Sequence, residues 1–146
     1  HCSPLQIQRY LSKISGPLLD RIDIHLDVPA LSAAEVMSPH SGENSAEIKK
    51  RTARARDIQQ NRLQENFINT NARMNHRQIK KFCCLSDDGK RLLKQAIEEL
   101  SLSARAYDKI LKVARTIADL DDQEHISPSH LAEAIQYRYL DRNWWG

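Results

Sequence analysis

Apolar residues recur in the second half of the chain at the three- and four-residue spacing of helices that bury one face. We predict helices over 2–15, 76–84, 86–100, 103–120 and 127–140. In the first of these, Ser3 and Gln6 have the spacing of a capping box. Because the later helices are joined by short loops, residues 75–142 are expected to form a compact helical bundle.

A long polar helix is predicted upstream of the bundle, over residues 44–67. Asn44 and Glu47 have the spacing of an N-cap pair at its start. Its apolar residues are sparse, so we expect it to lean on a neighbour along a thin stripe only. A loop rich in Ser, Pro and Gly, residues 30–43, precedes it.

One segment, residues 21–29, alternates between apolar and polar residues. The apolar positions are Ile22, Ile24, Leu26 and Val28, and Pro29 ends the pattern. A period of two predicts a half-buried strand. A single strand cannot satisfy its own backbone groups, so we expect its partners to lie in a sheet outside this chain. The predicted fold class is therefore mainly α, a helical bundle preceded by a long helix and one leftover strand.

Composition limits the class of protein. The chain has 146 residues, of which 40% are hydrophobic and 28% charged, and this fits one globular domain. No stretch approaches 18 continuous apolar residues, so a membrane span is not expected. The three cysteines, Cys2, Cys83 and Cys84, form neither a disulfide framework nor a metal-ligand spacing. A reducing, cytoplasmic location is the simplest expectation.

Positive charge is concentrated between Lys49 and Lys81. This stretch holds ten Lys and Arg residues but two acidic ones, a net +8 in a chain whose total is +3. Such asymmetry is found on nucleic-acid-binding faces, and it is also found on solvated helices. If nucleic acid binds here, the candidate residues are Lys49, Lys50, Arg51 and Arg54.

Two blocks of sequence resemble a known family. They are "SKISGPLLDRIDIHLDVP", residues 12–29, and "LSARAYDKILKVARTIADLDD" with "ISPSHLAEAIQYR", within residues 102–138. Together they resemble the C-terminal part of magnesium-chelatase-like AAA+ ATPases of the YifB/ComM type. The resemblance implies that residues 1–30 end the ATPase core and that 75–146 form the helical lid. Residues 31–74 would link the two.

The resemblance gives Arg21, in "LLDRID", the role of an arginine finger that reaches the neighbouring subunit of a ring. A guanidinium is always charged and offers five donors, which suits the charge that develops on a transferring γ-phosphate. Without the resemblance, the simpler interpretation is that Arg21 pairs with Asp20 or Asp23.

Arg105 matches the sensor-2 arginine of the lid. Ser103 is predicted to cap this helix, which places Arg105 in the first turn, where the macrodipole disfavours a cation. Free N–H groups at a helix start favour an anion, so a cation here suits a site that receives a triphosphate. The alternative is that Arg105 extends to Asp108 or to solvent.

A phosphate loop of the form G-x-x-x-x-G-K-[ST] and an apolar run ending in the paired acids that hold Mg²⁺ are not found among these 146 residues. The resemblance implies that they lie upstream, in a protein that binds ATP and Mg²⁺ and forms a ring, expected to be a hexamer, acting on DNA. We expect the chain alone to hold no cofactor or metal and to be inactive. Whether Cys2 belongs to a metal site is left open.

Two other functions are compatible with the sequence. The chain could be a stand-alone helical nucleic-acid-binding module that uses its basic stretch, residues 49–81. Few aromatic residues interleave those charges, which argues against a base-stacking surface. A structural adaptor could instead dock through the aromatic residues near the C-terminus, which are Tyr137, Tyr139, Trp144 and Trp145.

Overall fold

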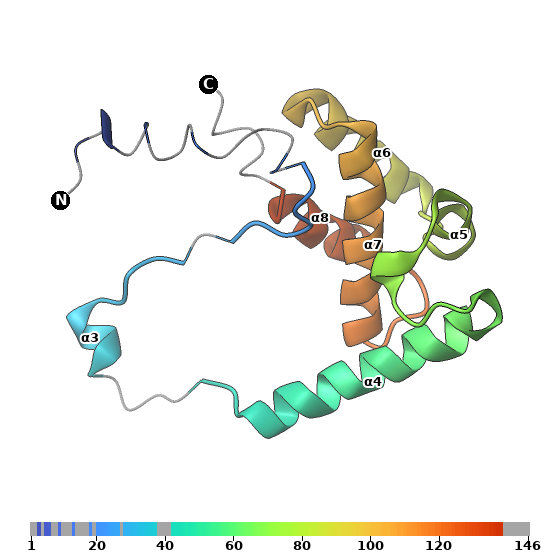
Figure 1. Cartoon of the computed structure of the whole chain (residues 1–146), viewed down its shortest axis with the longest axis horizontal. Helices are drawn as coiled ribbons and strands as arrows, with labels where there is room; N and C mark the ends of the chain where they lie inside the picture. Colours follow the sequence, from blue (N-terminus) through green and yellow to red (C-terminus); the bar gives the residue numbers. More distant parts are fainter. Residues whose placement is uncertain are drawn as a thin grey trace.

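The computed structural model describes residues 3, 5–6, 9, 13, 18, 20–26, 28–37 and 42–138 (Figure 1). Its α-helices are α3 (Ala33–Val36), α4 (Ser45–Leu63), α5 (His76–Phe82), α6 (Asp87–Leu100), α7 (Ala104–Leu120) and α8 (Pro128–Gln136). Two 3₁₀ turns, η1 (Gln64–Asn66) and η2 (Asn71–Arg73), lie between α4 and α5. The described part is therefore mainly helical, as predicted.

Side-chain caps set the helix starts where the sequence predicts them. Ser86, Ser103 and Ser127 each accept a hydrogen bond from the backbone N–H three residues further on. Asn44 likewise accepts from the N–H of Glu47, at 2.9 Å. These bonds satisfy N–H groups that a helix leaves without an internal partner, so each predicted start is confirmed to within a residue.

Helix α7 lies at the centre of the bundle and contacts α8, α4, α5 and η2, while α6 packs against α8 (Figure 1). The fully buried side chains of this core include Leu63 of α4, Ile79 of α5, Ile110 of α7 and Leu131 of α8. The apolar faces of α4, α5 and α8 are thus buried against one helix, which confirms the predicted bundle.

The long helix α4 touches the bundle with its C-terminal half only. Ala55, Gln59 and Leu63 are buried, whereas residues 45–54 are all exposed and extend beyond the bundle (Figure 1). The thin contact stripe expected from the sequence is confirmed. The helix ends earlier than predicted, because the chain turns through η1 and reaches a left-handed conformation at Phe67 (φ 55°).

The strand predicted over 21–29 does not form in the described residues 21–26 and 28–29. Its apolar side chains are exposed, from 40% at Ile22 to 83% at Val28. Within the described part the segment finds no neighbouring strand, and the N–H of His25 donates instead to the carbonyl of Tyr137, at 2.9 Å. A strand without a partner cannot pair its backbone groups, which explains the difference.

Parts of two other predictions lie outside the described residues. In the first helix, Leu5, Gln6 and Arg9 are helical, and Ser3 and Gln6 form the predicted reciprocal cap. The rest of residues 2–15, apart from Lys13, is not described, and neither are Tyr139, Trp144 and Trp145. Tyr137 is described, and its hydroxyl donates to Glu133 at 2.9 Å.

A charged cluster lies inside the bundle, centred on Asp119 of α7. The Asp119 carboxylate is fully buried, and it accepts hydrogen bonds from Arg62 of α4, Asn71 of η2 and Arg115 of α7. The Asn71 amide reaches it at 2.8 Å and the Arg115 Nε at 3.1 Å. Sequence analysis counted Arg62 with the basic stretch, but its side chain turns inward to this carboxylate.

We expect Asp119→Ala to lower the free energy of unfolding by about 3–5 kcal/mol, because it leaves two guanidiniums without their shared buried anion. Urea denaturation followed by circular dichroism measures this loss. The matched control is Asp88→Ala, since Asp88 is exposed in the first turn of α6 and pairs with Arg91 at the surface, so its loss should cost about 1 kcal/mol or less. Equal midpoints for the two variants would contradict the role of Asp119.

The adjacent cysteines should differ in reactivity. Cys83 is buried, and burial raises the pKa of its thiol from 9.0 to about 12, whereas Cys84 is exposed. Because the thiolate is the nucleophile, iodoacetamide at pH 8 should alkylate Cys84 in the folded chain and Cys83 only after unfolding. Peptide mass spectrometry distinguishes the two sites, and rapid labelling of Cys83 in the folded chain would contradict its burial.

Candidate functional site

The start of α7 carries a cation where an anion is the usual occupant. Its first turn contains Arg105 and no acidic residue, and the Arg105 side chain is 64% exposed. Ser103 caps the helix by accepting from the N–H of Ala106 at 3.1 Å. Sequence analysis predicted this arrangement, and it leaves the positive end of the helix dipole without a charge partner in its own turn.

Asp20 supplies the missing anion from a segment 83 residues upstream. Its carboxylate accepts a hydrogen bond from the Ser103 hydroxyl at 2.8 Å and another from Nη1 of Arg105 at 3.5 Å. Nη2 of Arg138 lies 3.9 Å from the same carboxylate. A carboxylate at a helix N-terminus contributes about 0.3–1 kcal/mol. The α7 start is therefore an anion-binding position, and a side chain of this chain occupies it.

The segment that follows Asp20 is fastened to α7 and to the end of α8. Nζ of Lys109 donates to the carbonyl of Arg21 and forms an ion pair with Asp23 at 2.8 Å. Nη1 of Arg138 donates to the carbonyl of Ile22. These contacts bring Arg21 and Arg105, which are 84 residues apart in sequence, to the same end of α7.

The simpler alternatives paired Arg21 with Asp20 or Asp23 and Arg105 with Asp108. In the described residues these acids have other partners. Asp20 pairs with Arg105 and Asp23 pairs with Lys109, while Asp108 faces His76 at 3.1 Å. The Arg21 side chain is exposed and makes no hydrogen bond or ion pair with any residue that the structure describes.

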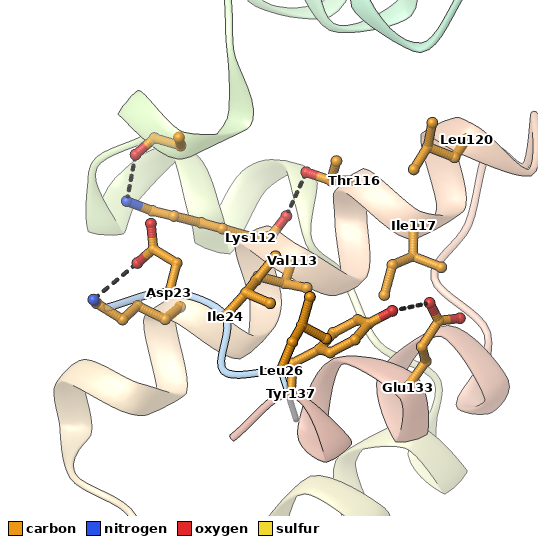
Figure 2. Close-up of a pocket in the computed structure, with 12 residues that line it drawn as sticks. Asp23, Ile24, Leu26, Lys112, Val113, Thr116, Ile117, Leu120, Glu133 and Tyr137 are labelled. Carbon is orange, nitrogen blue, oxygen red and sulfur yellow. Dashed lines mark hydrogen bonds and ion pairs between the residues drawn. The ribbon is translucent and has the colours of Figure 1, made fainter. Parts of the chain in front are cut away.

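A cavity of about 350 Å³ lies beside this anion position, between residues 23–26, α7 and α8 (Figure 2). Its lining is mainly apolar and comes from Ile24, Leu26, Val113, Ile117, Leu120 and Tyr137. At its rim Lys109 is paired with Asp23, and Lys112 donates to the carbonyl of Ala72 at 3.0 Å. Apolar walls and paired cations do not suit a phosphate.

The four basic residues singled out on α4 fall into two pairs. Lys49 and Lys50 are exposed and form no ion pair within the described residues. Arg51 holds the carboxylate of Glu43 with two hydrogen bonds, at 2.6 and 2.9 Å, and this contact lowers the pKa of Glu43. Arg54 pairs with Asp122 at the end of α7. These two ion pairs were not predicted from the sequence.

The described part of the chain also bears on metal binding and membrane insertion. No group of three or more His, Cys, Asp and Glu side chains is placed there to hold a metal ion. None of the described helices combines the length and apolar character that crossing a bilayer requires. Cys2, whose relation to a metal site the sequence left open, lies outside the described residues.

Three residues of the site were not found from the sequence, namely Asp20, Lys109 and Arg138. Asp20 gave one indirect signal, because a first-turn arginine without an acidic neighbour requires an anion from elsewhere. Lys109 and Arg138 are largely or fully buried, with side chains 13% and 1% exposed. Buried cations are rare unless they are paired, but burial cannot be read from a single sequence at these positions.

Comparisons with known proteins bear on this arrangement. The sequence profile described as magnesium chelatase, subunit ChlI C-terminal, matches residues 42–138, and the one described as magnesium chelatase, subunit ChlI, matches residues 1–36. The protein YifB of Salmonella typhimurium is 44% identical over 143 residues, which are 97% of this chain. The competence protein ComM of Haemophilus influenzae is 42% identical over 141 residues, or 96% of the chain.

Each of these two relatives is much longer than the region compared, since the chain spans 27% of their length. The C-terminal profile covers α4 to α8 and therefore includes the start of α7 with Arg105. The other profile covers the segment that contains Asp20 and Arg21. These matches confirm the resemblance to the YifB/ComM type, and the chain belongs to the magnesium chelatase, subunit ChlI, C-terminal family.

Proposed function

We propose that this chain contributes two arginines to ATP hydrolysis in a ring-shaped, magnesium-chelatase-like AAA+ ATPase. Arg105 acts as the sensor-2 arginine of the helical lid, and Arg21 acts as an arginine finger on the neighbouring subunit's nucleotide. The observation that carries this proposal is the anion position at the start of α7. There a carboxylate is held by the cap residue Ser103 and by Arg105.

Phosphate oxygens are acceptors of the same kind as the Asp20 carboxylate and carry more charge. A terminal phosphate at this position would meet the Arg105 guanidinium and the positive end of the α7 dipole together. The Arg105 side chain is 64% exposed, so it is able to reach such a ligand. Its present contact with Asp20 is a long one at 3.5 Å, and exposed pairs of this kind contribute little.

Arg21 suits the second role because its backbone is held while its side chain is exposed. In phosphoryl transfer, an arginine from outside the nucleotide pocket offsets charge on the γ-phosphate oxygens and contributes about 10³–10⁵ in rate. A finger that acts across a subunit interface makes hydrolysis depend on assembly. We therefore place the protein in a homo-oligomeric ring, with a hexamer as the expected size.

ATP and Mg²⁺ belong to this proposal as ligands of an ATPase core joined to the N-terminal side of the chain. One relative is named a competence protein, which favours DNA as the substrate on which the ring acts, as a branch-migration or helicase-type motor. The 146 residues carry neither a phosphate loop nor its paired acids, so we expect this chain alone to be inactive.

The second candidate function is a nucleic-acid-binding module. It is favoured by one observation, the exposed pair Lys49 and Lys50 on the half of α4 that extends beyond the bundle (Figure 1). It is weakened by the ion pairs of Arg51 and Arg54, because a phosphate would have to displace a carboxylate at two of the four expected contacts.

In a protein that contains the ATPase core, we expect Arg21→Ala to lower ATP turnover by about 10³-fold or more while ATP binding is retained. A coupled phosphate-release assay and fluorescent-nucleotide titration measure the two quantities. Arg91→Ala is the matched control, because Arg91 is an exposed arginine on α6 that pairs with Asp88. Turnover within twofold of the parent protein would contradict the finger.

Mixed rings test whether Arg21 acts on a neighbour. A subunit with a mutated phosphate loop still offers Arg21, and an Arg21→Ala subunit still binds ATP. If the finger acts across the interface, mixing these two inactive variants should restore part of the turnover. If it acts within its own subunit, the mixture should remain inactive.

For the second function, we expect the chain to bind fluorescent DNA near 50 mM salt with an affinity that falls steeply as salt rises. Lys49→Ala with Lys50→Ala should reduce the slope of log affinity against log salt by about two. The control is the double variant Lys90→Ala with Lys94→Ala, on the exposed face of α6, and it should leave the slope unchanged. Absence of binding at 50 mM salt would exclude the module.

A further inference from the structure

The loop that carries Arg21 is held on both sides by buried or nearly buried cations. Nζ of Lys109 binds the carbonyl of Arg21 and the carboxylate of Asp23, the latter at 2.8 Å. Arg138 binds the next carbonyl, that of Ile22, and lies 3.9 Å from Asp20. The backbone on either side of Arg21 is therefore fixed, whereas its own side chain is exposed.

The Lys109 ammonium group is largely removed from water at this position. Its side chain is 13% exposed and lines the apolar cavity between residues 23–26, α7 and α8. Burying a charge is costly unless it is paired and hydrogen-bonded. Here the ammonium group finds both partners within three residues of one loop, so the cost of burial is offset by contacts that fasten this loop to α7.

We propose that Lys109 is a positioning residue for Arg21, an inference that rests on the proposed function. It fixes the loop around Arg21, residues 20–23 (the finger loop), to α7, the helix that carries Arg105. The Arg21 guanidinium therefore extends from a defined point on the subunit surface. A misplacement of about 1 Å in a catalytic group can cost on the order of 10²-fold in rate. Lys109 acts on the reaction through the Arg21 backbone, without touching the nucleotide.

Lys112 is a matched control three residues along the same helix. It lines the same cavity, and its Nζ also donates to a backbone carbonyl, that of Ala72 at 3.0 Å (Figure 2). That carbonyl belongs to η2 and not to the finger loop. Lys112→Met therefore removes a comparable hydrogen bond from the same surface, and it leaves the contacts of Arg21 in place.

The first test is hydrogen exchange on residues 1–146, which needs no ATP. We expect Lys109→Met to raise the exchange rate by about tenfold or more at the amides of Arg21 and His25, which donate to the carbonyls of Leu18 and Tyr137. Lys112→Met should raise exchange around η2 and leave residues 21–26 unchanged. Asp23→Asn is a second variant that removes the ion pair without opening a cavity, and it should act in the same direction as Lys109→Met. Equal exchange of residues 21–26 in all three variants overturns the proposal.

The second test uses the protein with its ATPase core. Lys109→Met should lower kcat by about 10–100-fold with KM changed by less than twofold, because the finger acts in the transition state. Lys109→Arg should recover most of kcat, and Lys112→Met should leave it within twofold. The last comparison is made in an Arg21→Ala background, in single turnovers with excess enzyme. There Lys109→Met should not lower the hydrolysis rate further.

The outcomes separate this inference from the proposed function. If Arg21→Ala leaves turnover unchanged, the finger itself is wrong and both fail. If Arg21→Ala abolishes turnover but Lys109→Met behaves like Lys112→Met, the positioning role alone fails. If Lys109→Met lowers the rate as much without Arg21 as with it, Lys109 acts on another group and the inference is overturned.

Discussion

Helix α7 has to present a buried surface to α8, α4, α5 and η2 while it carries charged residues at both ends, and the carboxylate of Asp119 makes this possible. One buried anion accepts from Arg62 of α4, Arg115 of α7 and Asn71 of η2. Arg62 and Asn71 come from elements that pack on α7, so the polar cluster and the apolar core specify the same arrangement. If any of these buried groups lost its partner, the free energy of unfolding would fall by roughly several kcal/mol.

The same constraint, that a buried or helix-terminal charge needs a partner, organises the opposite end of α7. There Asp20 provides the anion that the first turn lacks, and Lys109 and Arg138 bind the residues around it. The two ends differ in exposure. Asp119 is fully enclosed and serves the fold, whereas Arg105 is 64% exposed and its contact with Asp20 is long. An exchangeable anion is therefore possible at the start of α7 and not at its last turn.

Local signals in the sequence predicted the helices and their starts, because a cap such as Ser103 and its N–H partner are three residues apart. The same signals placed Arg105 in a first turn. They could not find Asp20, which lies 85 residues away from Arg105, since only the folded chain brings the two together. Charge counting also failed for Arg62, because a basic residue that turns toward a buried carboxylate looks the same in sequence as a solvated one. The strand over 21–29 was predicted from its alternation, but forming it requires hydrogen-bonding partners that the described chain does not contain.

The uneven anchoring of α4 has a mechanical consequence. Its buried residues begin at Ala55, so the part of the helix from Ser45 to Arg54 packs on nothing in the bundle beyond the Arg54–Asp122 ion pair and is about 15 Å long at 1.5 Å per residue. A rotation of about 10° at the anchored half would sweep Ser45 through roughly 3 Å. A small adjustment where α4 packs on α7 would therefore be amplified into a larger displacement where the loop before α4 attaches.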